Sequence, residues 1–301
     1  MKILLTEKYP EIKQEYLDYL NKNNEVINIL DDYNNSEIDT IIIRSSIKVD
    51  LELLDKYRNL KFVARVGIGL DKVDLEECKN RDIKVLNTPG ANADSVADLA
   101  LAGILNLSRN LTSLQPSPLR GEGVRFIENR FDYMGSEFSS KSVGIIGFGN
   151  IGKKIYTRLK AFGVKSFYIF DPFLKKEDVE QNEFCKFIET KEEIFEHSDI
   201  ISFHIPLLDS TKDFLGKVEI KLLKKDVILV NTSRGGIINE KVLVHFLKEN
   251  PDSRFFADVW EEEPNDPKIE LLELENVLIT PHIGAMTKQA EEKMHFFKEL
   301  I

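Results

Sequence analysis

Residues 142–152 read SVGIIGFGNIG, and this stretch decides the fold. It runs from an apolar strand, through three glycines in the spacing GxGxxG, into a segment of helical character. In such a context Gly147 permits a tight turn, Gly149 lets the backbone approach a pyrophosphate, and Gly152 allows close packing of helix on strand. The helix N-terminus then offers free N–H groups to phosphates. The stretch therefore predicts a dinucleotide-binding βαβ unit.

An acidic residue in the right place strengthens this prediction. Asp171 follows the next apolar strand, where such folds carry an acid that binds the ribose hydroxyls. Its charge would repel a 2′-phosphate, which favours NAD over NADP, although Lys175 and Lys176 keep some NADP use open. Asn150 and Ile151, at the start of the helix, are also expected to contact the cofactor. The alternative is a structural glycine turn followed by an ordinary strand-end aspartate.

Strands and helices are expected to alternate along most of the chain. Apolar runs predict strands at 1–5, 40–43, 61–66, 83–86, 142–146, 166–170, 200–204, 227–231, 255–258 and 277–280. Helical spacing predicts helices at 11–20, 94–110, 151–162, 192–197, part of 212–222, and 240–249. Regular alternation of this kind predicts an α/β fold with parallel sheets covered by helices on both faces.

Composition narrows the class of protein. The chain has 301 residues, enough for two domains, and 51 acidic against 41 basic residues give a net charge of −10. An acidic surface repels phosphate backbones, so no nucleic-acid partner is expected. Cys78 and Cys185 lie in unrelated contexts, so neither a disulfide nor a metal site is expected. No signal peptide or membrane-spanning run is recognisable, and we expect a soluble cytoplasmic protein with no membrane partner.

Two segments bear on assembly. The helix at 94–110 is apolar on more than one face, which favours burial against a second subunit and therefore a homodimer. The segment 115–125, QPSPLRGEGVR, reads as an exposed loop or an insertion.

Three polar clusters near strand ends contain candidate substrate-binding and catalytic residues. They are NTSRGG at 231–236, DVWEEEP at 258–264 and TPHIG at 280–284. Arg234 is suited to bind a carboxylate through two parallel N–H groups. His282 is the natural acid–base group for interconverting a ketone and an alcohol, and a carboxylate such as Glu263 would stabilise its imidazolium form. Each has an ordinary alternative: an exposed turn arginine, a member of a solvated acidic run, and a satisfied strand-end histidine.

With these motifs in this order, the chain resembles the D-isomer-specific 2-hydroxyacid dehydrogenases, and within them the 3-phosphoglycerate dehydrogenases. The resemblance implies that Arg234 binds the substrate carboxylate and carbonyl, that His282 exchanges a proton with the 2-oxo oxygen, and that Glu263 polarises His282. Nicotinamide would exchange a hydride with C2. Asp258 matches the acid that meets the nicotinamide carboxamide. Further cofactor-lining positions are matched by His204, Pro206, Thr232 and Ser233, although for His204 a plain packing role remains open.

The resemblance also implies a substrate site in the N-terminal part. The turn at 66–69, with Ile68 and Gly69, matches a loop whose N–H groups receive the substrate carboxylate. Arg44 and Arg65 match basic positions that hold a substrate phosphate, and Arg130 is a third candidate. The alternative for Arg44 is an ion pair with a nearby acid such as Asp50.

We therefore expect two doubly wound, Rossmann- or flavodoxin-like domains with a cleft between them. Residues 1–93 and 284–301 would bind substrate and residues 94–283 would bind NAD, in a short form without a regulatory domain. The expected reaction interconverts 3-phosphoglycerate and 3-phosphohydroxypyruvate, in serine biosynthesis. One alternative is a glyoxylate or hydroxypyruvate reductase. An alternative of another class is an NAD-sensing protein similar to the family's corepressors.

Overall fold

The computed structural model describes residues 1–6, 14–28, 34–44, 47–111, 134–179, 184–263, 265, 269–295 and 297. The segment 115–125, Arg130 and Pro264, all singled out from the sequence, lie outside these residues. The chain forms two compact units. Unit 1 comprises Met1–Asn92 and Ala285–Ile301, and unit 2 comprises Ala93–Gly284. Both boundaries fall one residue away from the positions expected from the sequence.

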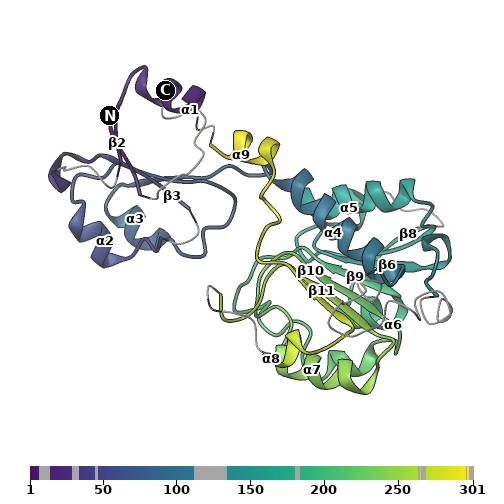
Figure 1. The fold of residues 1–301 in the computed structure, drawn as a ribbon. Helices are drawn as coiled ribbons and strands as arrows, with labels where there is room; N and C mark the ends of the chain where they lie inside the picture. The colour runs from purple at the N-terminus through teal and green to yellow at the C-terminus, as the bar shows by residue number, and fades with distance from the viewer. Residues whose placement is uncertain are drawn as a thin grey trace, which may run out of the picture. The chain divides into compact units, whose positions relative to one another are not determined.

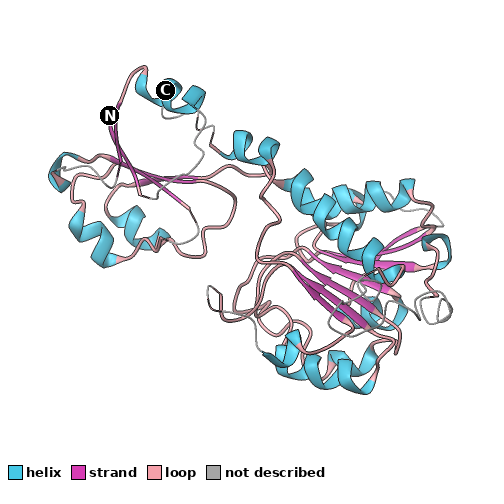
Figure 2. Cartoon of the chain, in the orientation of Figure 1, coloured by secondary structure: helices cyan, strands magenta, loops and turns pink. Residues whose placement is uncertain are grey.

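Unit 1 is built on a five-stranded sheet of order β2-β1-β3-β4-β5, in which every pairing is parallel (Figures 1 and 2). Its strands are β1 (Lys2–Leu5), β2 (Glu25–Asn28), β3 (Thr40–Ile43), β4 (Phe62–Arg65) and β5 (Lys84–Leu86). Its helices are α1 (Gln14–Asn21), the 3-10 turn η1 (Asn35–Glu37), α2 (Leu51–Lys56), α3 (Leu75–Asn80) and α9 (Lys288–Met294). Successive residues of a strand point to opposite faces, so Ile41 and Ile42 enter two separate apolar clusters. Both faces of the sheet are therefore covered.

Unit 2 is built on a seven-stranded parallel sheet of order β12-β11-β10-β9-β6-β7-β8. Its strands are β6 (Ser142–Ile146), β7 (Ser166–Phe170), β8 (Cys185–Phe187), β9 (Ile200–Phe203), β10 (Ile228–Asn231), β11 (Arg254–Ala257) and β12 (Val277–Ile279). Its helices are α4 (Ala93–Ser108), η5 (Phe138–Ser140), α5 (Asn150–Ala161), η6 (Lys176–Asp178), α6 (Lys191–His197), η7 (Glu219–Leu222), α7 (Glu240–Glu249) and α8 (Ile269–Leu272). The strand order reverses between β6 and β9, and doubly wound sheets bind ligands at the carboxyl ends of strands at such a point.

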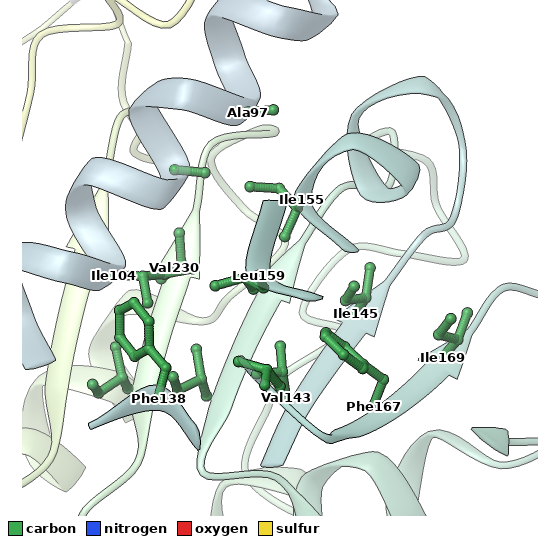
Figure 3. Close-up of a cluster of buried hydrophobic side chains, with 14 of the residues drawn as sticks. Ala97, Ile104, Phe138, Val143, Ile145, Ile155, Leu159, Phe167, Ile169 and Val230 are labelled. Carbon is green, nitrogen blue, oxygen red and sulfur yellow. The ribbon is translucent and has the colours of Figure 1, made fainter. Parts of the chain in front are cut away.

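Two apolar clusters hold the layers of unit 2 together. On one face of the sheet Ile104 of α4 and Leu159 of α5 pack with Val143 and Ile145 of β6 (Figure 3). On the other face Ile146 packs with residues of α6, α7 and β9. In α4, a Cβ at Gly103 would lie only 2.1 Å from the Phe256 ring, so this glycine permits the close approach of α4 to the sheet.

The fold class is confirmed, and the strands expected at 142–146 and 166–170 match β6 and β7. Two strands were not expected from the sequence, β2 and β8, which are short edge strands that pair with one neighbour each. The prediction of an α-helix within 212–222 was wrong, because the helical structure in this range is the 3-10 helix η7. Asp213 takes a positive φ of 52°, which a right-handed helix does not allow, and Leu215 instead forms a β-bridge.

Within the part of the chain that the structure describes, no helix is both long enough and apolar enough to cross a membrane.

A polar contact fixes the amino ends of the central strands of unit 2. One carboxylate oxygen of Asp199 accepts hydrogen bonds from the Ser142 backbone N–H (2.7 Å) and hydroxyl (2.8 Å). The other oxygen accepts one from Lys224 Nζ, also at 2.7 Å. Burial raises the pKa of Asp199, but the bonds from Lys224 and Ser142 outweigh it, and the net pKa lies below the ordinary value.

Replacing Asp199 with Asn should therefore destabilise the protein by about 1–3 kcal/mol at pH 7, the cost of weakening a partly buried charged network. Since the folded-state pKa is lowered, the contribution of Asp199 is present above the ordinary carboxyl pKa of about 4 and is lost as the pH falls further. Urea unfolding of both proteins between pH 3 and pH 7 measures this difference. Asp226→Asn is the control, because the Asp226 side chain is 58% exposed and its contact with Lys141 is long, at 3.6 Å. Equal effects of the two substitutions at pH 7 would contradict the prediction.

Candidate active site

The glycine-rich turn lies between β6 and α5. Gly147 has a positive φ of 89°, and a Cβ on Gly152 would lie 2.1 Å from the Gly147 carbonyl oxygen. Both positions therefore need glycine, one for its backbone conformation and one for the close packing of helix on turn. Asn150 and Ile151 open α5, so their N–H groups belong to the first turn, which has no intrahelical acceptors.

Gly149 is a glycine for a different reason. A Cβ placed on it would meet no atom within 4 Å, and its φ of −78° is one that any residue adopts. Neither the fold nor the backbone of unit 2 therefore requires glycine here. Open space at the N-cap of α5 is what a phosphate group needs in order to approach the helix N-terminus.

Asp171 follows β7 and is fixed beside the same turn. One carboxylate oxygen accepts the Phe148 N–H at 2.8 Å, and the other accepts the Phe173 N–H at 2.9 Å. The carboxylate therefore holds the glycine-rich turn against the end of β7. The ordinary structural role and the predicted ribose-binding role are compatible, because each carboxylate oxygen can accept a second hydrogen bond.

Two buried polar atoms lie at the carboxyl ends of β9 and β10 without a hydrogen-bond partner in the part of the chain that the structure describes. His204 Nε2 lies 2.9 Å from the Ser202 hydroxyl, while His204 Nδ1 and Thr232 Oγ1 are buried and have no hydrogen-bond partner among the described residues. Burial lowers the pKa of His204 to about 3, so its ring is neutral. The Pro206 carbonyl accepts the Thr211 hydroxyl at 2.6 Å. Buried polar atoms without partners at a ligand-binding edge of a sheet favour a polar ligand there.

The turn after β10 is organised by Asn231. Its amide oxygen accepts hydrogen bonds from the Ser233 N–H (3.1 Å) and hydroxyl (2.7 Å), and its amide nitrogen donates to the Arg234 carbonyl at 2.8 Å. A Cβ on Gly235 would lie 1.9 Å from the Trp260 carbonyl oxygen, so glycine lets this turn contact the turn after β11. Arg234 is partly exposed, and its guanidinium donates to the Ser233 carbonyl at 2.7 Å.

Glu263 and His282 form a hydrogen-bonded pair. Oε2 of Glu263 lies 2.5 Å from Nδ1 of His282, and Oε1 accepts the Trp260 N–H at 3.1 Å. An ionised carboxylate only accepts hydrogen bonds, which assigns the proton of the neutral ring to Nδ1. The His282 side chain is 44% exposed, so Nε2 remains available to exchange a proton with another molecule. This is the geometry of a histidine oriented by an acid for proton transfer.

The histidine sits on a backbone turn held by Asp258. His282 has a positive φ of 52°, an uncommon conformation for a residue with a side chain. One carboxylate oxygen of Asp258 accepts the Thr280 hydroxyl at 2.6 Å and the Ile283 N–H at 2.8 Å, and the other accepts the Gly284 N–H at 2.7 Å. Burial raises the pKa of Asp258 above its ordinary value, although these hydrogen bonds lower it. Asp258 thus fixes the residues on both sides of His282.

Comparisons with known proteins identify the family of this chain. Residues 101–284 match the model of the D-isomer specific 2-hydroxyacid dehydrogenase NAD-binding domain. The chain belongs to this family. A hydroxypyruvate reductase of Thermotoga maritima is 35% identical over 99% of this chain and 94% of its own length. A D-3-phosphoglycerate dehydrogenase of Methanocaldococcus jannaschii is 37% identical over 85% of this chain, which spans 47% of that protein.

A solved structure gives the same result for the fold. A D-lactate dehydrogenase from Aquifex aeolicus, complexed with NAD and lactic acid, superposes with a TM-score of 0.81 at 26% identity, covering 98% of this chain and 92% of that one. The family model that this chain matches is that of an NAD-binding domain, so the cofactor of this chain is NAD. The residues of unit 2 fit it: the open space at Gly149 suits a pyrophosphate, and the buried atoms of His204 and Thr232 offer polar contacts.

Apart from Arg234, the residues expected to bind substrate lie in unit 1, at or directly after the carboxyl ends of β3 and β4. Gly67 has a φ of 120°, and the Arg65 guanidinium lies across it and donates to the Val66 carbonyl at 2.9 Å. The Ile68 carbonyl accepts the Asn87 side-chain amide at 2.9 Å, which supports the turn that continues into Gly69.

Arg44 follows β3 and forms an ion pair, but with Glu291 of α9 and not with Asp50. Asp50 instead caps α2 by accepting the Leu53 N–H at 3.2 Å and lies 3.5 Å from Lys48.

Sequence reasoning missed several residues that shape these turns. Asn231 was recognised as part of a motif but not as the residue that organises the turn, a role that asparagine side chains take often at such positions. Asp258 was assigned only to the cofactor. Glu291 was not considered, because it is far along the chain from Arg44 and belongs to no motif.

Two glycine substitutions should separate ligand binding from folding. Gly149→Ala should leave the melting temperature nearly unchanged, because the added Cβ meets nothing, but should weaken NADH binding by about tenfold or more. Gly152→Ala should instead destabilise the protein by about 1–3 kcal/mol through overpacking against Gly147. Thermal unfolding and fluorescence titration with NADH measure both quantities. Unchanged NADH affinity in Gly149→Ala would show that the open space is not the phosphate site.

Proposed function

We propose that Arg234, Glu263 and His282 form the catalytic set of an NAD-dependent reaction that interconverts a small 2-oxo acid and its D-2-hydroxy acid. The observation that carries this proposal is the Glu263–His282 pair on the turn held by Asp258. Glu263 follows β11 and His282 follows β12, two strands of the same sheet whose β6–α5 turn has the open space at Gly149. An oriented acid–base group and a dinucleotide site on one sheet are the two elements that the reaction needs.

Each residue has a defined task in the proposed reaction. Nε2 of His282 gives a proton to the 2-oxo oxygen during reduction and takes it back during oxidation. Glu263 fixes the ring through Nδ1 and stabilises the imidazolium by its charge. The Arg234 guanidinium binds the substrate carboxylate and the carbonyl oxygen, which draws electron density away from C2. NAD supplies the hydride acceptor, or as NADH the hydride donor.

In the proposed reaction, NAD would bind to a set of residues in unit 2. These are Gly147, Gly149, Asn150, Ile151, Gly152, Asp171, His204, Pro206, Thr232, Ser233 and Asp258. The two buried polar atoms at the ends of β9 and β10 support the contribution of His204 and Thr232. For Asp258, one carboxylate oxygen accepts a single protein hydrogen bond, which leaves it able to accept another from the carboxamide.

Two substrates compete within this activity. Relatives named D-3-phosphoglycerate dehydrogenase support the sequence-based expectation of 3-phosphoglycerate and serine biosynthesis, but the chain spans 47% and 54% of the archaeal ones. The relative named hydroxypyruvate reductase is matched over 94% of its length, and a glyoxylate reductase of Thermococcus litoralis over 77%. The engagement of Arg44 by Glu291 favours this second candidate, a hydroxypyruvate or glyoxylate reductase.

We further propose a homodimer and a cytoplasmic location. Helix α4 supports the dimer, because its Leu99, Leu101 and Leu105 remain partly exposed although they pack against the core. An NAD-sensing protein of the corepressor type is the alternative of another class. It would show partner binding that depends on NADH and no turnover.

The direct test is oxidation of NADH, followed at 340 nm, by the purified protein with hydroxypyruvate, glyoxylate or phosphohydroxypyruvate. His282→Ala should lower kcat by at least about 10²-fold, the usual contribution of a general acid. Glu263→Gln should lower kcat less, because the ring keeps a hydrogen-bond acceptor but loses the charge.

His245→Ala is the matched control, since His245 is an exposed histidine of α7 that lies 3.3 Å from Glu249. Absence of turnover with every 2-oxo acid, or equal activity of His282→Ala and the unmodified protein, would refute the catalytic proposal.

A further inference from the structure

Arg44 and Glu291 form a half-buried ion pair within unit 1. Nη2 of Arg44 is hydrogen-bonded to Oε1 of Glu291, and the two side chains are 24% and 28% exposed. Partial burial strengthens the interaction relative to a fully solvated surface pair, because less water screens the two charges. The positive charge of Arg44 is therefore largely compensated by the protein itself.

Glu291 is held in place by a packed helix. Thr287 caps α9 by accepting the Ala290 N–H at 3.2 Å, and Ala290 and Met294 are buried in the core of unit 1 with Ile42. The acid therefore projects from a fixed element and not from a loose loop.

His295 adds no compensating positive charge to the pair. Its Nδ1 lies 2.7 Å from the Glu291 carbonyl oxygen and 3.6 Å from the Glu291 carboxylate. Burial lowers the pKa of His295, as does the charge of Arg44, and these effects outweigh the opposite effect of Glu291. The ring is therefore neutral near pH 7, and Arg44, Glu291 and His295 together carry about zero net charge.

The pair lies at the sheet edge where ligands are expected. Ile43 of β3 is paired with Arg65 of β4, so Arg44 comes directly after the paired positions and beside the turn at 66–69. That turn is the proposed receiver of the substrate carboxylate. An anionic group bound at Arg44 would have to displace the Glu291 carboxylate or lie next to it, and like charges in contact are unfavourable.

We propose that Glu291 is a specificity-determining residue, which neutralises Arg44 and thereby selects 2-oxo acids with an uncharged substituent at C3 over those that carry a phosphate there. This inference rests on the proposed function, since it names the substrate class of that same site. Hydroxypyruvate and its C3 phosphate ester differ only in this group, so they are the natural pair of probes.

The test is Glu291→Gln, which keeps the shape of the side chain and removes its charge. We expect the ratio of kcat/KM for phosphohydroxypyruvate to that for hydroxypyruvate to rise by about tenfold or more, as expected when one charge–charge contact is removed. The unmodified protein should prefer hydroxypyruvate. The gain should disappear in Arg44→Met/Glu291→Gln, because the liberated cation is then absent.

Glu292→Gln is the matched control, since it makes the same change of net charge at the neighbouring, exposed position of α9. Thermal unfolding shows whether each variant is folded. Dissociation constants of 3-phosphoglycerate and glycerate, measured by calorimetry with NADH present, give the same comparison without turnover, because neither 2-hydroxy acid can pass a hydride to the reduced cofactor.

The outcomes separate the two proposals. If no 2-oxo acid is turned over, the proposed function fails, while the ratio of dissociation constants still decides the role of Glu291. An unchanged ratio in Glu291→Gln, or a preference of the unmodified protein for the phosphate ester, would overturn the role of Glu291 alone.

Discussion

The candidate site depends most on the hydrogen bonds that the buried carboxylate of Asp258 accepts. Its oxygens hold Thr280, Ile283 and Gly284, and the residue between them, His282, is kept in a left-handed conformation. Without these bonds, the backbone at His282 would be expected to relax to a commoner conformation and carry the ring away from Glu263. Burying an ionised group is costly, and the three hydrogen bonds offset part of that cost, so the pKa of Asp258 stays above its ordinary value.

Contacts to the backbone also position the other two residues of the candidate catalytic set. Gly235 brings the turn after β10 against Trp260, whose N–H in turn orients Glu263. Asn231 fixes the backbone from which Arg234 extends. Every element of the candidate catalytic set is thus supported by backbone contacts between turns at one edge of the sheet, where parallel strands end together.

The local features of this fold could be predicted from sequence, and the long-range pairings could not. The β6–α5 turn was recognisable because three glycines, an apolar strand and a helix occur within a few residues. The edge strands β2 and β8 were missed, since a strand with a single neighbour needs less apolar character. The helix expected near 212–222 failed where Asp213 and Leu215 adopt non-helical conformations. The pairing of Arg44 with Glu291 joins residues from opposite ends of the chain, and only the packing of α9 on unit 1 creates it.

The division of the chain has a consequence for its synthesis. Unit 2 is continuous, and its two ends are tied together by the hydrogen bond from the Ser95 hydroxyl to the Gly284 carbonyl, at 2.6 Å. It can therefore complete its fold as soon as Gly284 has left the ribosome. Synthesis of unit 1 begins first, but its core lacks α9 and the side chains of Ala290, Met294 and Phe297 until the residues after Gly284 have also been made. The unit whose synthesis starts first is thus the one that finishes folding last, and the sheet face that α9 helps to cover stays incompletely covered meanwhile.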